Sequence, residues 1–138
     1  PVIEVVFQAG ARRLAVLSFH AARPVSEREA GVQEADYAYL LDWVSEQQMA
    51  GRETLVIGDF NATPWSSRFR ELVGLGDLRN SLAGRGLQGS WPASLPALLR
   101  LPIDHAVHSP GVVTSGRRLG PPVGSDHLPL LVEAAFRP

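Results

Sequence analysis

Two polar residues, Asp59 and Asn61, follow directly after an apolar run of strand length that ends at Gly58. In an extended backbone, side chains two positions apart project to the same side, so two hard oxygen donors would point one way. Such donors suit Mg²⁺, Mn²⁺ or Ca²⁺ better than zinc. An Asx-type turn explains the same residues, because Asp, Asn and the following Pro64 are all turn formers. The segment alone leaves a metal site and a structural turn as equal alternatives.

Two later motifs pair an acidic residue with a histidine, Asp104-His105 and Asp126-His127, and each lies at an end of an apolar strand pattern. A histidine becomes an effective general acid or base when a carboxylate fixes its tautomer and ring orientation. We expect Asp104 to orient His127 from a neighbouring strand, and Asp126 to add an oxygen to the cleft of the first two polar residues. The alternative is two capped strand ends with incidental histidines.

A further histidine, His20, ends the second of two apolar runs, Val2–Phe7 and Leu14–Phe19, which predict a β-hairpin with Gly10 in its connection. Pro24 prevents regular continuation, so His20 lies where a strand opens into a loop. A lone histidine in such a place is more often structural or exposed than catalytic. Its position alone therefore favours a structural role.

The next segment predicts a helix that leads into the strand before Asp59. Ser26 and Glu29 have the spacing of a capping box, and apolar residues with a helical period follow, so we expect a helix over residues 28–50. A strand, a helix and a strand then occur in sequence, which is the pattern of a right-handed crossover between parallel strands. The strand ends of open α/β sheets are where such proteins place their ligands.

The remaining sequence predicts shorter elements. We expect a short helix over residues 65–73, a long irregular loop over 77–100, and strands over 101–109, 111–118 and 128–136. The loop contains Trp91, which could stack on a base or pack in the core, and packing is the commoner use of such a residue. Together these elements predict one mixed α/β (α+β) domain over residues 1–138.

The composition excludes several classes of protein. The 138 residues are 45% hydrophobic and 20% charged, which is enough for one domain with a real core. A net charge of -1 provides no overall attraction to a phosphate backbone. The absence of cysteine excludes disulfides and thiolate metal sites. No apolar run approaches the length of a membrane span, so we expect a soluble segment without membrane contact.

Three motifs carry a family resemblance: Gly58-Asp-Phe-Asn61, Pro102-Ile-Asp-His105 and Gly124-Ser-Asp-His-Leu-Pro129. In this order, and with His20 on an earlier strand, they resemble the C-terminal half of the endonuclease/exonuclease/phosphatase (deoxyribonuclease I-like) superfamily, over the chain from Val2 onward. The resemblance implies Mg²⁺- or Mn²⁺-dependent hydrolysis of a phosphoester, in a sandwich of mixed β-sheets flanked by helices. The run Ser90-Trp-Pro-Ala93 is similar to a bacterial branch whose longer members often carry N-terminal membrane segments.

The resemblance also implies roles for individual residues. Catalytic roles fall on His20, Asp59, Asn61, Asp104 and His127, and metal contacts fall on Asp59, Asn61 and Asp126. His127 would activate or position the attacking water, with Asp104 as its orienting carboxylate. His20 would contact the phosphate or assist the leaving oxygen.

The chain also departs from this family. The family's fold normally needs a longer chain, whose first half supplies an asparagine and a metal-binding glutamate. We therefore expect a partial active site, and weak or no activity from this chain alone. A sheet without its packing partner would expose apolar surface, which favours self-association.

Two functions from different classes stay open. The leading one is a nuclease or phosphodiesterase whose substrate is a nucleic acid, a lipid head group or a small phosphodiester. The alternative is a non-catalytic sandwich domain that binds a protein or membrane partner. Nothing in the sequence identifies the compartment, although a membrane-anchored bacterial parent is one expectation.

Overall fold

A strand–helix–strand unit forms the centre of the fold, as the sequence predicts. In the computed structural model, which describes residues 2–138, β2 (Arg12–His20) and β3 (Glu53–Asp59) are parallel neighbours connected by α1 (Glu27–Met49). Ser26 caps α1, because its hydroxyl accepts a hydrogen bond from the Glu29 backbone N–H at 3.2 Å. The crossover therefore brings the two strand ends to one edge of the sheet.

The main sheet has the strand order β1-β2-β3-β5-β4 within the described residues. Its remaining strands are β1 (Ile3–Ala9), β4 (Arg79–Asn80) and β5 (Asp104–His108), which pair antiparallel with their neighbours. A second sheet consists of β6 (Val112–Leu119) and β7 (Leu130–Phe136), also antiparallel. The predicted hairpin and the mixed α/β class with two sheets are both confirmed.

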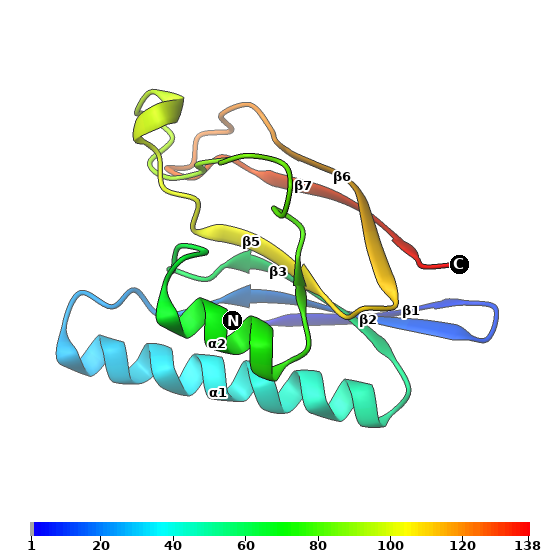
Figure 1. Cartoon of the computed structure of the whole chain (residues 1–138). Coiled ribbons are helices and arrows are strands. Elements are labelled where there is room, and N and C mark those ends of the chain that lie inside the picture. Colours follow the sequence, from blue (N-terminus) through cyan, green and yellow to red (C-terminus); the bar gives the residue numbers. More distant parts are fainter. Residues whose placement is uncertain (1) are drawn as a thin grey trace.

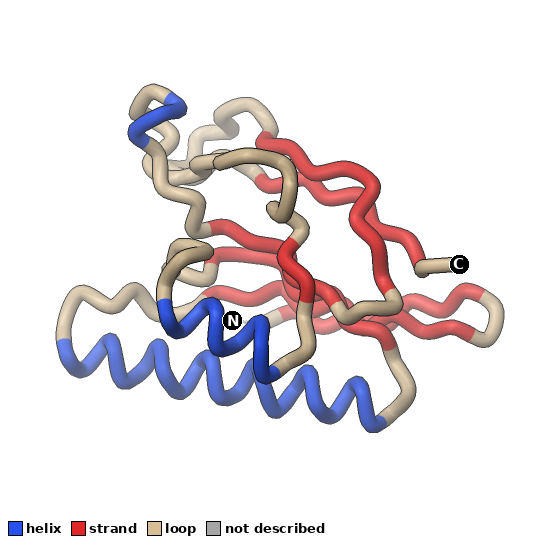
Figure 2. Tube along the Cα trace, in the orientation of Figure 1, coloured by secondary structure: helices blue, strands red, loops and turns tan. Residues whose placement is uncertain are grey.

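The main sheet is covered by different layers on its two faces. Figure 1 shows α1 and α2 (Ser67–Leu75) on one face and the β6–β7 pair over the other. The core lies under the helices, where Leu17, Leu40 and Val56 are fully buried. Figure 2 shows the longest loops gathered at the end of the sheet away from the β1–β2 turn. His20 ends β2 on that side, so the loop-rich end is where polar side chains meet.

A buried arginine connects the two sheets. Arg117 of β6 is 6% exposed, and its guanidinium donates to Ser81 Oγ at 2.8 Å and to the Asp104 carbonyl at 3.1 Å. Burial lowers the pKa of Arg117 to about 10, because desolvation disfavours the charged form. Arg117 therefore holds the first residue of β5 from the opposite sheet while it stays charged at neutral pH.

Two element boundaries differ from the sequence prediction. The short helix expected over residues 65–73 is α2, which passes through Gly74 and ends at Leu75; the N–H of the C-cap residue Gly76 donates to the Leu72 carbonyl at 2.9 Å. Glycine lowers helix propensity but does not prevent a helix, and α2 therefore continues two residues beyond the expected end at residue 73. The last strand begins at Leu130 rather than at residue 128, because proline supplies no N–H at the preceding position.

The long loop also contains more structure than expected. Residues 77–100 include β4 and a short 3₁₀ helix, η1 (Ala97–Leu99). Leu101 pairs with Trp91 in an isolated β-bridge, so the strand expected from residue 101 begins only at Asp104. The loop is therefore closed at its base by main-chain hydrogen bonds.

The outer strand β1 is apolar and exposed. Ile3, Val5, Val6 and Phe7 all expose large parts of their side chains. Surface of this kind is the basis for the prediction of self-association, which stays a prediction. Among residues 2–138, no helix combines the length and the apolar character required to cross a bilayer.

Candidate active site

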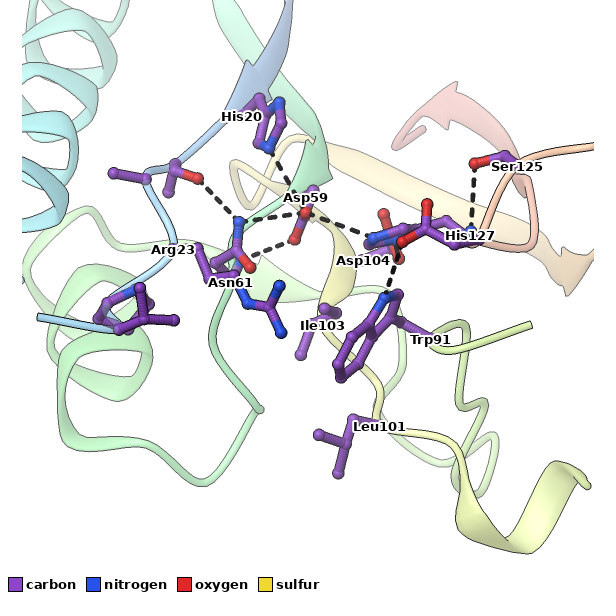
Figure 3. Close-up of a pocket in the computed structure, with 15 residues that line it drawn as sticks. His20, Arg23, Asp59, Asn61, Trp91, Leu101, Ile103, Asp104, Ser125 and His127 are labelled. Atoms are coloured by element: carbon purple, nitrogen blue, oxygen red, sulfur yellow. Dashed lines mark hydrogen bonds and ion pairs between the residues drawn. The ribbon is translucent and has the colours of Figure 1, made fainter. Parts of the chain in front are cut away.

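Three titratable side chains form one row across the main sheet. The strand register pairs His20 of β2 with Asp59 of β3, and Asp59 with Asp104 of β5. Parallel β2 and β3 end together, and antiparallel β5 begins beside them. The row therefore lies where the strands give way to loops, and Figure 3 shows the three side chains around one cleft.

Asp59 is the centre of this cluster. Its Oδ2 lies 3.6 Å from His20 Nε2 and 3.8 Å from His127 Nε2. Burial raises the pKa of Asp59, and the neighbouring Asp104 carboxylate raises it further, while the Asn61 N–H and the two histidines oppose the shift. A carboxylate that holds its proton more tightly than usual is a better base and a stronger attractor of cations.

His127 is held by the carboxylate that the sequence indicated. Its Nδ1 lies 2.8 Å from Asp104 Oδ2, so the ring donates Nδ1–H to that oxygen and turns Nε2 toward Asp59. The His127 backbone N–H donates to Ser125 Oγ at 3.1 Å, which fixes the loop that carries it. Hydrogen bonds of both the ring and the backbone of His127 therefore fix the orientation of the imidazole.

The turn expected at Asp59 and Asn61 is also present. The Asn61 N–H donates to Asp59 Oδ1 at 2.8 Å, and Asn61 has a φ of 45°, a left-handed conformation that asparagine tolerates. Its Nδ2 donates to the Ala21 carbonyl at 2.9 Å and to Asp59 Oδ2 at 3.2 Å. The turn thus brings the Asn61 side chain beside the carboxylate, so a structural turn and a site are compatible.

Asp126 precedes His127 in the sequence and lines the same cleft. Its Oδ2 accepts a hydrogen bond from Trp91 Nε1 at 3.1 Å. The Arg23 guanidinium stacks over the Trp91 ring, 5.0 Å from its centroid. Trp91 is half-buried and lines the cleft, so its role differs from the core packing that the sequence favoured.

The second acidic–histidine motif divides between the site and the core. Asp104 faces the cleft, whereas His105 is fully buried between Phe60 and Phe69, with ring centroids 5.5 and 4.2 Å away. Its Nε2 donates to the Ala62 carbonyl at 2.8 Å, because a carbonyl can only accept. Burial lowers the pKa of His105 to about 4. This histidine supports the loop after Asn61 from within the core.

All six predicted site residues line one cleft of about 730 Å³, to which Arg23 and Trp91 also contribute. Sequence reasoning missed Arg23 and Arg117. Arg23 lies three positions after His20, in the loop that follows β2, so its closeness to His20 in the sequence could have indicated it. Nothing local marks Arg117, because its contacts come from segments far away in the sequence.

The cleft fits only part of a metal site. Within residues 2–138, no three His, Asp or Glu side chains are grouped so that they could hold a metal by themselves. Mg²⁺ usually keeps several waters and takes one or two carboxylates together with substrate phosphates. Asp59, Asn61 and Asp126 line the cleft with hard oxygen donors. Burial is the main cause of the raised pKa of Asp59, and the nearby Asp104 carboxylate adds to it, so a bound cation would stabilise the charged form of Asp59.

Comparison with solved structures identifies the fold. A functionally unknown conserved protein from Enterococcus faecalis V583 has a TM-score of 0.74 and 19% identity, over 99% of this chain and 56% of that one. The 3'-5' exonuclease from Neisseria meningitidis has a TM-score of 0.71 and 21% identity, over 96% and 64%. The mannosyl-6-phosphatase from Bacteroides thetaiotaomicron VPI-5482 has a TM-score of 0.68 and 16% identity, over 91% and 51%. The chain thus spans between half and two thirds of these proteins.

Comparison of sequences identifies the family. No match is found among curated proteins. Residues 3–127 match the model of the Endonuclease/Exonuclease/phosphatase family, which is most of the chain. This match agrees with the fold of the solved structures and with the resemblance carried by the three motifs. The chain therefore belongs to the endonuclease/exonuclease/phosphatase family, a superfamily of hydrolytic phosphoesterases.

Proposed function

We propose that this chain forms part of the active site of a phosphoester hydrolase that depends on Mg²⁺ or Mn²⁺. The strongest support is the His127 imidazole, with Nδ1 2.8 Å from Asp104 Oδ2 and Nε2 3.8 Å from Asp59 Oδ2. A histidine held in this way keeps one tautomer and presents Nε2 to the cleft, which suits proton transfer. Family membership supports the same class of reaction.

In the proposed reaction, a water attacks phosphorus from the side opposite the leaving oxygen. Asp59 and His127 Nε2 direct this water and take its proton, and Asp104 stabilises the positive charge that then develops on the imidazole. The phosphorus–oxygen ester bond breaks, and the leaving oxygen takes up a proton. Asn61 contacts the phosphate, and the exposed His20 contacts the phosphate or assists the leaving oxygen.

Asp59, Asn61 and Asp126 are the residues that would hold the cation. A bound Mg²⁺ offsets charge on the non-bridging phosphate oxygens and orients the substrate. The three carboxylates that line the cleft support this assignment, since they would repel an anionic phosphoester if no cation were bound.

Family membership indicates a phosphoester substrate but does not indicate which kind of phosphoester. The solved relatives are described as an exonuclease and a mannosyl-6-phosphatase, so the fold serves both nucleic-acid and sugar phosphoesters. The assignment of residues 1–138 to one domain, as the C-terminal portion of a larger one, stays a prediction. So does the expectation that the chain alone is weakly active or inactive.

Thermal unfolding with Mg²⁺ and inorganic phosphate tests the site without requiring turnover. Ligands that bind the folded state raise the unfolding temperature. We expect a rise when both are added, loss of the rise in Asp59→Asn, and an unchanged rise in Asp42→Asn, a matched change on the exposed side of α1. An unfolding temperature that ignores Mg²⁺ and phosphate would count against the proposal.

The non-catalytic alternative is the weaker one. A binding domain would have no need for an imidazole held between two carboxylates at the ends of two neighbouring strands. Polar clusters of this kind cost stability through burial and charge repulsion, and they persist where function requires them. The family is also hydrolytic.

A further inference from the structure

The guanidinium of Arg23 lines the cleft without a partner for its charge or for its hydrogen-bond donors. Within residues 2–138, no ion pair joins Arg23 to a carboxylate, and its side chain donates no hydrogen bond. Other arginines of the chain donate to main-chain carbonyls, namely Arg12, Arg85, Arg100 and Arg117. A planar guanidinium with free donors can bind two oxygens of one anion at once. Arg23 therefore has the properties of an anion-binding residue.

Helix α1 fixes the backbone directly before Arg23. The Ala22 N–H donates to Asp36 Oδ2 at 2.7 Å. Gln33 Nε2 donates to the Ala22 carbonyl at 3.0 Å and to the Asn61 carbonyl at 3.1 Å. Gln33 is 4% exposed, so water competes little for these bonds. One buried side chain thus ties the loop that carries Arg23 to the loop that carries Asn61.

Trp91 holds the other end of the Arg23 side chain. The guanidinium lies over the indole ring, 5.0 Å from its centroid, and Figure 3 shows Arg23 and Trp91 in the same cleft. Stacking uses the face of the guanidinium and leaves the N–H groups at its edge free. The ring is itself held by the bond to Asp126 and by main-chain bonds of 2.6 and 3.2 Å with Leu101. The guanidinium is thus held in position and can still donate.

The same indole ring lies next to the proposed reaction centre. The ring centroids of Trp91 and His127 are 6.3 Å apart. The guanidinium nevertheless forms no ion pair with Asp59 or Asp104, the carboxylates on either side of the imidazole. An anion bound to Arg23 would therefore lie near the reaction centre but outside it.

We propose that Arg23, stacked on Trp91, is a subsite for a second anionic group of the substrate, beside the phosphoester that is cleaved. The expected group is a phosphate or a carboxylate, because both present two oxygens to the edge of a guanidinium. This inference rests on the proposed function in one respect, since that function places the cleaved phosphate at Asp59 and His127. Arg23 would then determine specificity, favouring doubly anionic substrates, without taking part in bond cleavage.

Isothermal titration with three small anions, at one fixed concentration of free Mg²⁺, tests this subsite. Inorganic phosphate can fill the reaction centre only, whereas pyrophosphate adds a second phosphate and 2-phosphoglycolate adds a carboxylate. We expect the unchanged protein to bind at least one of the two doubly anionic ligands more tightly than phosphate. Arg23→Gln should weaken that binding by about tenfold to a hundredfold, because charge-assisted hydrogen bonds are lost. Its affinity for phosphate should change by less than about threefold.

Two further variants separate the geometry of the guanidinium from its charge. Arg23→Lys keeps the charge but has no planar pair of donors, so it should recover only part of the affinity. Arg13→Gln removes the same charge from an exposed position at the other end of β2, and it should bind all three anions as the unchanged protein does. Thermal unfolding checks that each variant is folded.

Three results would overturn the subsite. They are the absence of binding by all three anions, equal affinity of the unchanged protein for all three, and an equal loss for all three in Arg23→Gln. Tighter binding of pyrophosphate alone would assign the subsite to phosphate, of 2-phosphoglycolate alone to carboxylate, and of both to either group. An Arg23-dependent preference in a protein that lacks the Asp59-dependent response to Mg²⁺ and phosphate would retain the subsite and refute the proposed function. The reverse pattern would refute the subsite alone.

Discussion

The two histidines that follow an aspartate, His105 and His127, have opposite environments. His127 is carried by a loop, is held by Asp104 and faces a polar cleft. His105 lies in β5, one position after Asp104, and is fully buried against two phenylalanines. Neighbours in a strand point to opposite faces, so the same pair of residue types supplies a site carboxylate and a core imidazole. Local sequence alone cannot distinguish the two.

Removal of the His127 imidazole should cause the largest loss of activity. His127→Ala removes proton transfer at the cleft, and we expect phosphodiester turnover with Mg²⁺ to fall by about a hundredfold to ten-thousandfold. The folding free energy should change by less than about 1 kcal/mol, because the ring is partly exposed. Hydrolysis of bis(p-nitrophenyl) phosphate and chemical denaturation measure the two effects. Equal turnover in the variant, when the unchanged protein turns the substrate over measurably, would remove His127 from the proposed chemistry.

His105 should instead control stability, and with a defined pH dependence. Folding lowers its pKa from 6.5 to about 4, so the unfolded chain binds more protons between these pH values. Its contribution is complete above pH 6.5 and is lost as the pH falls toward 4, by roughly 3 kcal/mol. His105→Gln keeps an N–H donor for the Ala62 carbonyl and removes the titration. Urea unfolding at several pH values should show an unfolding free energy that depends less on pH in His105→Gln than in the unchanged protein.

Asp59 should show a conflict between stability and function. Its pKa is raised in the folded protein, so its contribution to stability is present below the unfolded pKa and is lost as the pH rises through the folded one. Without a cation, Asp59→Asn should therefore stabilise the protein at neutral pH, by up to about 1 kcal/mol. Thermal unfolding in a chelator measures this gain. A destabilised variant under these conditions would mean that the carboxylate is structural.

Of the four substitutions considered, removal of the Trp91 indole N–H should have the smallest effect. Trp91→Phe keeps a ring under the Arg23 guanidinium but removes the hydrogen bond to Asp126. One hydrogen bond to a partly exposed carboxylate corresponds to about 1 kcal/mol, so Mg²⁺ affinity should change by less than about tenfold. Isothermal titration with Mg²⁺ checks this expectation. A larger change would show that Trp91 orients Asp126 more strongly than a single bond implies.

Much of the fold was predictable because it follows from short-range patterns. The hairpin, the capped helix and the crossover depend on alternation, on Ser26 and on an apolar stripe, all of which lie within a few tens of residues. The boundary at Asp104 was not predictable, because the bridge between Trp91 and Leu101 competes with the strand. Arg117 was also missed. Its role in joining the two sheets depends on contacts among three segments that only the folded chain brings together.

The site was predictable in its members but not in its geometry. Residue types at strand ends indicated the six side chains, and the family resemblance assigned their roles. The strand register that aligns His20, Asp59 and Asp104 depends on pairing between distant segments. The exposure of Leu98 and Leu99 is likewise a property of the folded loop, which no period in the sequence indicates.

Paramagnetic broadening by Mn²⁺ tests most directly whether these side chains form one cation site. The chain has three tryptophans, and their indole N–H signals are separate probes: Trp91 in the cleft, Trp43 in the core and Trp65 on the surface. We expect substoichiometric Mn²⁺ to broaden the Trp91 signal first, and Asp59→Asn to prevent this. Broadening of Trp65 before Trp91, or of no signal at all, would contradict a cation site formed by Asp59, Asn61 and Asp126.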